Sequence, residues 1–351
     1  MTQPPPRRAP RAFPIDDAPV YTAYIAGRQS AALAVAVRVG LFDRLDAAED
    51  ASEAEIGAWF GWSERGTRSM VAALSAMGLL ERRGDRVALS AVAAAYAVRD
   101  RAGSLWALID MEVENFLSPA ALMTALERDD SSVYGGGDPW EAHEADPEKA
   151  RAFTRAMHSV SERPAAGFAE VVEFPAGSHV LDVGGGSGAL SIAIARAWPD
   201  ARCTIFDLAS VCAVAHEYVA AAGVADRVDT MVGDMFGESL PEGHDAILFS
   251  QILHDWSFDT GRTLLAAAFA ALPPGGRVLI HEKLVDDDAD TPLVNALVHL
   301  DMLVWTRGQQ YRFRELREML EAVGFAAVER RPTAGVWSVV IATRPDDGGR
   351  G

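Results

Sequence analysis

The chain has 351 residues, of which 49% are hydrophobic, and its formal net charge is −18 at neutral pH. This length and composition are sufficient for two domains with sizeable buried cores. The strong negative charge argues against a nucleic-acid partner, because binding to phosphates depends on a basic surface that displaces counterions.

The first 20 residues combine six prolines with arginines and lack an apolar period, so we expect residues 1–20 to form a disordered arm. No apolar segment follows these arginines, as a signal peptide would require. The apolar stretches elsewhere are too short to span a membrane and are broken by charges. The two cysteines, Cys203 and Cys212, cannot define a disulfide framework. These features predict a cytoplasmic protein without a membrane partner.

Residues 21–100 are predicted to form the first folded domain. Its first element is an Ala/Val/Leu helix within residues 21–45, which is expected to end at Gly40-Leu41-Phe42. Ser52 is expected to cap the next helix, with Glu55 three residues later completing a capping box.

A further helix runs from Ser63 to Met77, and residues 79–89 resemble a hairpin that turns at Gly84-Asp85. This is the pattern of a winged helix. Its would-be recognition helix offers only Arg65 and Arg68 as basic contacts, and acidic residues flank it, which disfavours a role in DNA binding.

Residues 101–173 show a helical pattern interrupted by a glycine-rich loop, and we interpret them as a linker and the wall of a pocket. Phe153, Met157 and Ser161 repeat every four residues, which places them along one helix face. Large apolar side chains here and further along the chain predict a flat, mostly hydrophobic small-molecule acceptor. These candidates are Phe116, Met123, Trp140, Met157, Met302 and Trp305.

The run Val180 to Gly188 is the most informative segment, because four strand positions lead into a glycine-rich turn and then into a helical pattern. Glycines allow a sharp turn and let a ligand approach the N–H groups at the start of the helix. Asp182, Gly184 and Gly186 are therefore candidate cofactor-binding residues. A turn of this kind also fits a dinucleotide site.

Two later strands also end in polar groups suited to an adenosyl ligand. Asp207 and Leu208 close the first, where a carboxylate can hold a ribose diol. The second ends at Gly233-Asp234-Met235-Phe236, which supplies a carboxylate and apolar surfaces for an adenine amine and ring.

From residue 174 to residue 345 strands and helices alternate, as in a parallel doubly wound sheet. Two last strand-like runs, residues 326–329 and 337–342, are close enough together for an antiparallel pair. The sequence therefore predicts a Rossmann-like α/β domain with a seven-stranded mixed sheet, followed by a flexible tail over residues 346–351. The expected parallel strands lie near residues 179–183, 203–207, 228–232, 245–250 and 277–282.

These motifs, taken together and in order, resemble those of the S-adenosylmethionine-dependent small-molecule O-methyltransferases, which include plant caffeate and hydroxyindole enzymes and bacterial tailoring enzymes of antibiotic and other natural-product biosynthesis. The resemblance rests on residues 181–188, 206–208, 233–236, 253–256 (Leu-His-Asp-Trp), 273–276 (Pro-Pro-Gly-Gly) and Glu282. It implies S-adenosylmethionine as the cofactor and a homodimer formed by the N-terminal domain. It also implies that Met157 lies between cofactor and acceptor, where a thioether packs well on aromatic rings.

Methyl transfer to a hydroxyl requires in-line positioning and a base that takes the proton. His254 follows the strand that ends at Ser250 and is the candidate base, because imidazole titrates near neutrality. Glu282, at the end of the next strand, is expected to fix the tautomer of His254, and Asp255 to orient the loop or the acceptor.

The chain departs from the plant-type pattern at two positions. Gln310 stands where many relatives carry a second glutamate beside the histidine, so activation by two carboxylates is in doubt. Ser250, which we still include among the cofactor-binding candidates, stands where plant relatives use a lysine to contact the adenine.

A second group of candidates, His299, Met302 and Leu303, shares one helix face and is expected to contact the acceptor. An alternative joins His254, Asp255 and His299 in a metal site of the two-histidine, one-carboxylate type, with C-methylation of an α-keto acid. Methylation of carbon or nitrogen therefore stays open beside O-methylation. Two further alternatives are a family member that binds the cofactor but has lost methyl transfer, and a dimeric regulatory protein. The sequence does not identify the acceptor.

Overall fold

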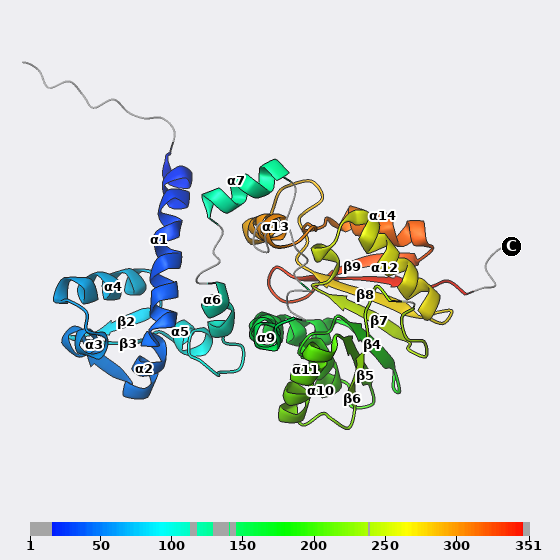
Figure 1. Cartoon of the computed structure of the whole chain (residues 1–351), viewed down its shortest axis with the longest axis horizontal. Coiled ribbons are helices and arrows are strands. Elements are labelled where there is room, and N and C mark those ends of the chain that lie inside the picture. The colour runs from blue at the N-terminus through cyan, green and yellow to red at the C-terminus, as the bar shows by residue number, and fades with distance from the viewer. Residues whose placement is uncertain (1–15, 113–117, 129–139, 141–144, 238, 347–351) are drawn as a thin grey trace, which may run out of the picture. The chain divides into compact units, whose positions relative to one another are not determined.

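A computed structural model describes residues 16–112, 118–128, 140, 145–237 and 239–346. By contacts along the chain it divides into two compact units, the first ending at Val98 and the second beginning at Arg99 (Figure 1). Phe116, one of the predicted acceptor residues, lies outside the described residues.

The first unit combines helices with a small antiparallel sheet in the order β1-β3-β2. Its elements are α1 (Ala18–Arg38), α2 (Leu41–Ala48), β1 (Asp50–Ser52), α3 (Glu53–Phe60), α4 (Glu64–Ala76), β2 (Leu80–Arg83), β3 (Arg86–Leu89) and α5 (Ala91–Tyr96). The capping box of Ser52 and Glu55 and the cap at Ser63 are confirmed, as is the hairpin formed by β2 and β3. Strand β1 was not predicted.

Two expectations for this unit need correction. Helix α1 begins at Ala18, inside the arm predicted to be disordered, because Pro19 in the first turn has no N–H to satisfy and its φ suits a helix. The first helix ends before Gly40, near the expected end, but residues 41–45 belong to a second helix, α2, which starts after Gly40 takes a left-handed φ of 73°. Within the described part of the chain no single helix is long and apolar enough to span a bilayer, although the bent pair α1–α2 passes the same test by length and composition.

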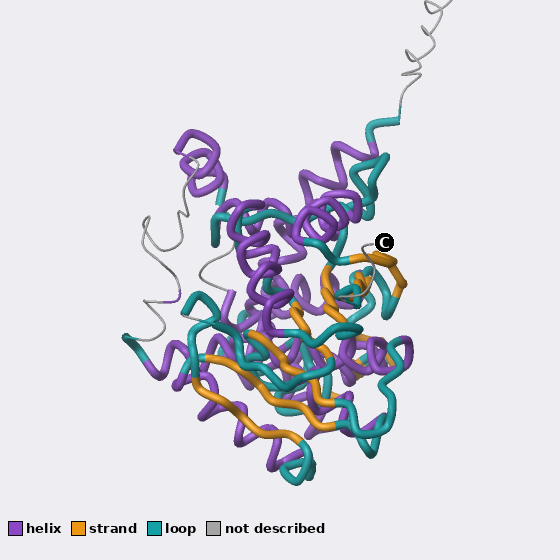
Figure 2. The backbone as a smooth tube through the Cα atoms, turned by 90° about the vertical axis from the view of Figure 1, so that its right-hand side faces the viewer, coloured by secondary structure: helices purple, strands orange, loops and turns teal. Residues whose placement is uncertain are grey.

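The second unit is a seven-stranded sheet with helices on both faces, as Figure 2 shows with strands in orange and helices in purple. The strand order is β6-β5-β4-β7-β8-β10-β9, parallel from β6 to β8, with β10 antiparallel to both β8 and β9. The strands are β4 (His179–Val183), β5 (Arg202–Asp207), β6 (Val228–Val232), β7 (Ala246–Ser250), β8 (Arg277–Glu282), β9 (Ala326–Pro332) and β10 (Ser338–Thr343).

The predicted mixed sheet is thus confirmed. Only β9 differs clearly from expectation: it continues to Pro332 rather than Glu329, because its pairing with β10 extends that far. The helices of this unit are α6 (Trp106–Glu112), α7 (Pro119–Arg128), α9 (Pro147–Val171), α10 (Ala189–Ala197), α11 (Ala209–Ala222), the 3₁₀ turn η1 (Leu253–Asp255), α12 (Phe258–Ala271), α13 (Leu293–Trp305) and α14 (Phe313–Val323).

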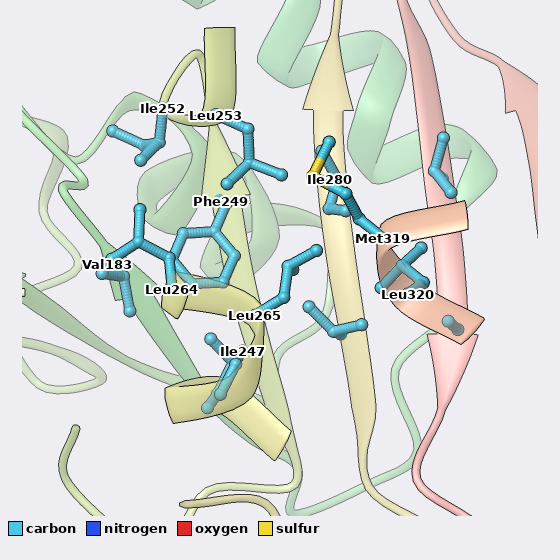
Figure 3. Packing of buried hydrophobic residues seen from close by; sticks show 14 of the residues in the cluster. Val183, Ile247, Phe249, Ile252, Leu253, Leu264, Leu265, Ile280, Met319 and Leu320 are labelled. Carbon is cyan, nitrogen blue, oxygen red and sulfur yellow. The ribbon is translucent and has the colours of Figure 1, made fainter. Parts of the chain in front are cut away.

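Alternation along the strands divides the core into two layers. Ile247 and Phe249 of β7 pack with Leu264 and Leu265 of α12 and with Met319 of α14 (Figure 3). Intervening residues such as Leu248 face α9, α10 and α11 instead. Both faces of the sheet are therefore covered, so ligands have access to the edge where the parallel strands end.

Candidate active site

The glycine-rich loop links the end of β4 to the start of α10. Gly184 has a φ of 63°, and its N–H donates to the carbonyl oxygen of Phe206, 2.8 Å away. A side chain at position 184 would also collide with Ile252. This position therefore requires glycine, both for its backbone conformation and for the close approach of the turn that follows β7.

Asp207 forms hydrogen bonds with the segments that follow β4, β5 and β6 at this edge of the sheet. Its Oδ2 accepts the N–H of Gly186 at 2.8 Å, its Oδ1 accepts the N–H of Leu208 at 2.7 Å, and its carbonyl accepts from Gly233 at 3.0 Å. Burial raises the pKa of Asp207 to about 6, and the two backbone hydrogen bonds oppose that rise. Above this pH the side chain is a fixed carboxylate with remaining acceptor capacity.

The end of β6 and the segment that follows it present a largely exposed surface near Asp207. Met231, Val232 and Phe236 are 42%, 62% and 41% exposed, although their side chains are large and apolar. Asp234 is exposed and accepts the N–H of Phe236 at 2.8 Å, while Met235 packs against the core. The partly exposed ring of Phe236, close in sequence to the carboxylate of Asp234, suits an adenine.

Asp182 is placed differently from the other cofactor candidates. It is 1% exposed, and its Oδ2 accepts from the Ser191 hydroxyl of α10 at 2.7 Å. Burial raises its pKa to about 7. Its described contact thus connects strand and helix beneath the glycine loop.

Beyond β7 the chain turns sharply toward a second group of side chains. Gln251 has a φ of 56°, in the left-handed region, and its amide Nε2 donates to the hydroxyl of Ser161 on α9 at 3.0 Å. Ser250 is also engaged within the protein, because its hydroxyl lies 3.2 Å from Nδ1 of His281. These two contacts connect the end of β7 to α9 and to β8.

His254 lies in the turn η1 and is 8% exposed. Its Nδ1 is 2.6 Å from the Nε2 of Gln310 and 3.6 Å from the Oε2 of Glu282, and its Nε2 is 3.7 Å from the Oδ1 of Asp255. Burial lowers the pKa of His254 to about 3, and the positive charge of Lys283 acts in the same direction. The imidazole is therefore neutral at physiological pH.

The two carboxyl groups beside His254 also have raised pKa values. Burial raises the pKa of Glu282 to about 8, although its Oε1 accepts the N–H of Ile252 at 3.1 Å. Burial and the nearby Glu282 raise the pKa of Asp255 well above its ordinary value. The cluster is thus built from buried groups that favour their neutral forms, a property frequent at functional sites.

A chain of aromatic rings connects the end of β6 with α9. The ring of Phe236 is 4.6 Å from that of Trp256, Trp256 is 6.4 Å from Trp140, and Trp140 is 5.9 Å from Phe153. Met157 follows one turn after Phe153 on α9 and is partly buried. These rings extend from Phe236, whose surface suits an adenine, to Phe153 on α9, the helix predicted to line the acceptor pocket.

The predicted acceptor residues on α13 differ in how far they are buried. Met302 and Leu303 are partly buried, as is Trp305, whereas His299 is exposed. Met123 on α7 is 55% exposed. Within the described ranges no three or more His, Cys, Asp or Glu side chains lie close enough to hold a metal ion, so the structure does not assemble His254, Asp255 and His299 into one site.

The resemblance placed Gln310 beside His254, in agreement with the contact seen here, but sequence reasoning did not predict the hydrogen bond itself and missed the bridge from Gln251 to Ser161. Each joins residues tens of positions apart, 56 for the first pair and 90 for the second. The position of Gln310 was noticed only as a departure from relatives, and nothing local marks Gln251 as a left-handed residue.

A doubly wound sheet whose strand ends present a glycine loop, a carboxylate and an exposed aromatic ring defines an adenosyl-cofactor-binding α/β protein. Comparison with known families specifies it further: residues 121–326 match the O-methyltransferase domain, and residues 23–99 match the O-methyltransferase dimerisation domain. The chain therefore belongs to the S-adenosylmethionine-dependent O-methyltransferase family.

Among similar proteins, the 3-hydroxy-5-methyl-1-naphthoate 3-O-methyltransferase of Streptomyces sahachiroi is 37% identical over 84% of this chain and 86% of its own. The L-tyrosine C(3)-methyltransferase of Streptomyces lavendulae is 29% identical, covering 84% and 82%. The solved structure of PigF with S-adenosylhomocysteine is 28% identical, has a TM-score of 0.81 and covers 94% of this chain and all of that one. The chain is thus an enzyme that uses S-adenosylmethionine to methylate a small acceptor.

Proposed function

We propose that this enzyme methylates a hydroxyl group of a flat aromatic or polyketide-like natural product, with His254 as the general base. The observation that carries the proposal is the buried, neutral imidazole of His254 at the strand edge that also holds the glycine loop and Asp207. An O-methyltransferase acting on a naphthoate is among the similar proteins, which supports an aromatic hydroxyl as the acceptor.

The residues present fit S-adenosylmethionine. The carboxylate of Asp207 would accept from the ribose hydroxyls, the loop at Gly184 and Gly186 would lie against the amino-acid portion, and Phe236 would cover the adenine. A side chain at Gly186 would meet nothing within 4 Å, so the loop leaves open space there. When bound, the cofactor supplies a methyl group on a positively charged sulfur.

Within this site, His254 removes the proton from the acceptor hydroxyl as the new oxygen–carbon bond forms, so that the product is a neutral ether. The aromatic rings of Trp140, Phe153 and Trp256, together with Met157, hold the acceptor plane and exclude water. Asp255 lies beside Nε2 of His254, where its carboxyl group contributes to orienting the hydroxyl.

The test replaces His254 by alanine and uses 3-hydroxy-5-methyl-1-naphthoate as the first probe acceptor, within a panel of hydroxylated naphthoates and anthraquinones. Loss of a general base should lower kcat by about 10²- to 10⁴-fold. Affinity for S-adenosylhomocysteine, measured by calorimetry, should stay within about twofold, because Asp207 and the glycine loop are intact.

His244→Ala is the matched control, because His244 lies two residues before β7 and thus at the opposite end of the strand that leads to His254. It should leave kcat unchanged. Full turnover by His254→Ala would contradict the assignment of the base, and loss of cofactor binding in that variant would show that the histidine acts by holding the fold.

Methylation of carbon is the second candidate, and the similar L-tyrosine C(3)-methyltransferase favours it. An activated aromatic carbon next to a hydroxyl would use the same base and the same flat pocket. Mass spectrometry of the product after mild ether cleavage separates the two, because a methyl group on oxygen is removed and one on carbon is retained.

The dimerisation domain indicates a homodimer. In support, Val20, Tyr21 and Tyr24 of α1 expose 76%, 59% and 62% of their surface, more than apolar side chains of a lone chain usually do. Light scattering of the purified protein should give about twice the chain mass, and a monomer at micromolar concentration would contradict the proposal.

A further inference from the structure

We propose that His158 of α9 is a positioning residue for the cofactor: its hydrogen bond with Ser187 fixes the glycine loop in the conformation that receives the amino-acid end of S-adenosylmethionine. The inference does not depend on the general base. It rests on one part of the proposed function, the placement of the amino-acid portion at Gly184 and Gly186. Three features carry it: the loop itself, the hydrogen bond from α9, and the contacts that hold the imidazole of His158.

The loop offers a single side chain by which it can be held. Ser187 is the one residue with a side chain between Gly184 and Gly188. Its neighbours Gly186 and Gly188 take left-handed φ angles of 58° and 78°, and glycines have more alternative conformations to lose than other residues. A hydrogen bond that orders this loop before binding therefore lowers the entropic cost of binding a ligand there.

The hydroxyl of Ser187 is held by α9. Nδ1 of His158 lies 2.7 Å from Oγ of Ser187, which is 4% exposed. Helices α9, α10 and α11 lie side by side (Figure 1), and their apolar residues share one core layer with the sheet. The hydrogen bond therefore connects a packed helix to the loop that precedes α10, across 29 positions of the sequence.

The imidazole of His158 is itself held by two further side chains. The ring of Tyr218 on α11 stacks on it, with 3.7 Å between the ring centroids and 26° between the planes. Nε2 of His158 lies 3.7 Å from Oε1 of Glu162, whose Oε2 accepts the N–H of Gly103 at 2.5 Å. The contact with His158 lowers the pKa of Glu162, which is therefore ionised at neutral pH. This carboxylate favours a proton on Nε2, so Nδ1 is left to accept from the hydroxyl of Ser187.

Loss of this hydrogen bond should affect one part of the ligand more than the rest. Asp207, proposed to hold the ribose, also accepts from the N–H of Leu208, outside the loop. Phe236, proposed to cover the adenine, follows β6 and contacts the ring of Trp256. The amino-acid end depends most directly on the loop, so release of Ser187 should weaken the binding of that end.

Calorimetric titration with two ligands tests the proposal. S-adenosylhomocysteine carries the amino-acid portion, whereas 5′-methylthioadenosine has the same adenine, ribose and sulfur without it. His158→Phe keeps a ring for the stack on Tyr218 and removes the hydrogen bond with Ser187. The Kd for S-adenosylhomocysteine should rise about 3- to 10-fold, the effect of one hydrogen bond between neutral groups, while the Kd for 5′-methylthioadenosine stays within about 1.5-fold.

Two further variants separate the hydrogen bond from other effects of the substitution. Ser187→Ala removes the same bond from the side of the loop, so the double variant with His158→Phe should bind no more weakly than Ser187→Ala alone. His158→Asn places an amide acceptor near the position of Nδ1 and should bind S-adenosylhomocysteine within about twofold of the parent.

His216→Phe is the matched control, because His216 of α11 forms a similar pair with a hydroxyl, its Nε2 lying 2.7 Å from Oγ1 of Thr230 on β6. It should leave both Kd values unchanged.

An unchanged Kd for S-adenosylhomocysteine in His158→Phe, or equal weakening of both ligands, would overturn the role of His158. Additive losses in the double variant would do the same. If His158→Phe does not fold, the ratio of the two Kd values in Ser187→Ala decides between these outcomes. Failure of the proposed base is seen separately, as full turnover by His254→Ala, because none of these variants changes His254.

Discussion

Replacing Asp207 by asparagine tests the cofactor edge most directly. The carboxylate is held by the N–H groups of Gly186 and Leu208 and is expected to accept from the ribose of the cofactor. A hydrogen bond to a charged acceptor contributes about 1.5–3 kcal/mol, so losing one should weaken binding about 10- to 100-fold. Calorimetric titration with S-adenosylhomocysteine at pH 7.5 measures this change.

The pH dependence of cofactor binding tests the role of Asp207 in a second, independent way. The pKa of Asp207 is raised to about 6, so its carboxylate is ionised above that pH and becomes protonated as the pH falls below it. If the ionised form is the ribose acceptor, the Kd for S-adenosylhomocysteine should rise by up to about tenfold per unit below pH 6. Asp182, with a pKa of about 7, contributes a separate step at higher pH. In Asp207→Asn the step near pH 6 should disappear, and the step of Asp182 should move to lower pH, because the charge of Asp207 raises the pKa of Asp182.

Asp229→Asn is the matched control, because Asp229 is an exposed carboxylate on the adjacent strand β6 whose Oδ1 accepts the N–H of Thr230 at 2.8 Å. It should leave both the Kd and its pH dependence unchanged. An Asp207→Asn protein that binds as tightly as the parent across pH 5–8 would refute the assignment of Asp207 to the ribose.

Two further substitutions test packing and buried titratable groups. Gly233→Ala would place a methyl group against the ring of Phe206, which should lower the free energy of unfolding by about 1–3 kcal/mol; an unchanged urea midpoint would contradict this packing. His281 is fully buried and its pKa is lowered to about 3, so its stabilising contribution is complete above the unfolded pKa of about 6.5 and is lost as the pH falls toward 3. Between pH 7 and pH 5 the free energy of unfolding of the parent protein should therefore fall by about 2 kcal/mol more than that of His281→Gln. Urea titrations of both proteins at the two pH values measure this difference. Equal losses would show that the pKa of His281 is not lowered by folding.

Much of the fold followed from local patterns in the chain. The apolar runs and the glycine turn at residues 180–188 predicted the parallel sheet, and serine caps such as Ser52 predicted helix starts, because both depend on residues close in sequence. The same reasoning located Asp207 and His254 at the ends of β5 and β7, since parallel strands bring their carboxyl ends to one edge.

What the sequence by itself determined is therefore the architecture, the family and the edge at which the site lies. Only the tertiary structure decided which side chains meet there: that Gln310 contacts the imidazole of His254, that Asp182 bonds Ser191, and that His299 is exposed on its helix. The reason is physical. Periodicity and spacing are set by neighbours within a few residues, whereas contacts, burial and pKa values at a site depend on how elements distant in the chain pack against one another.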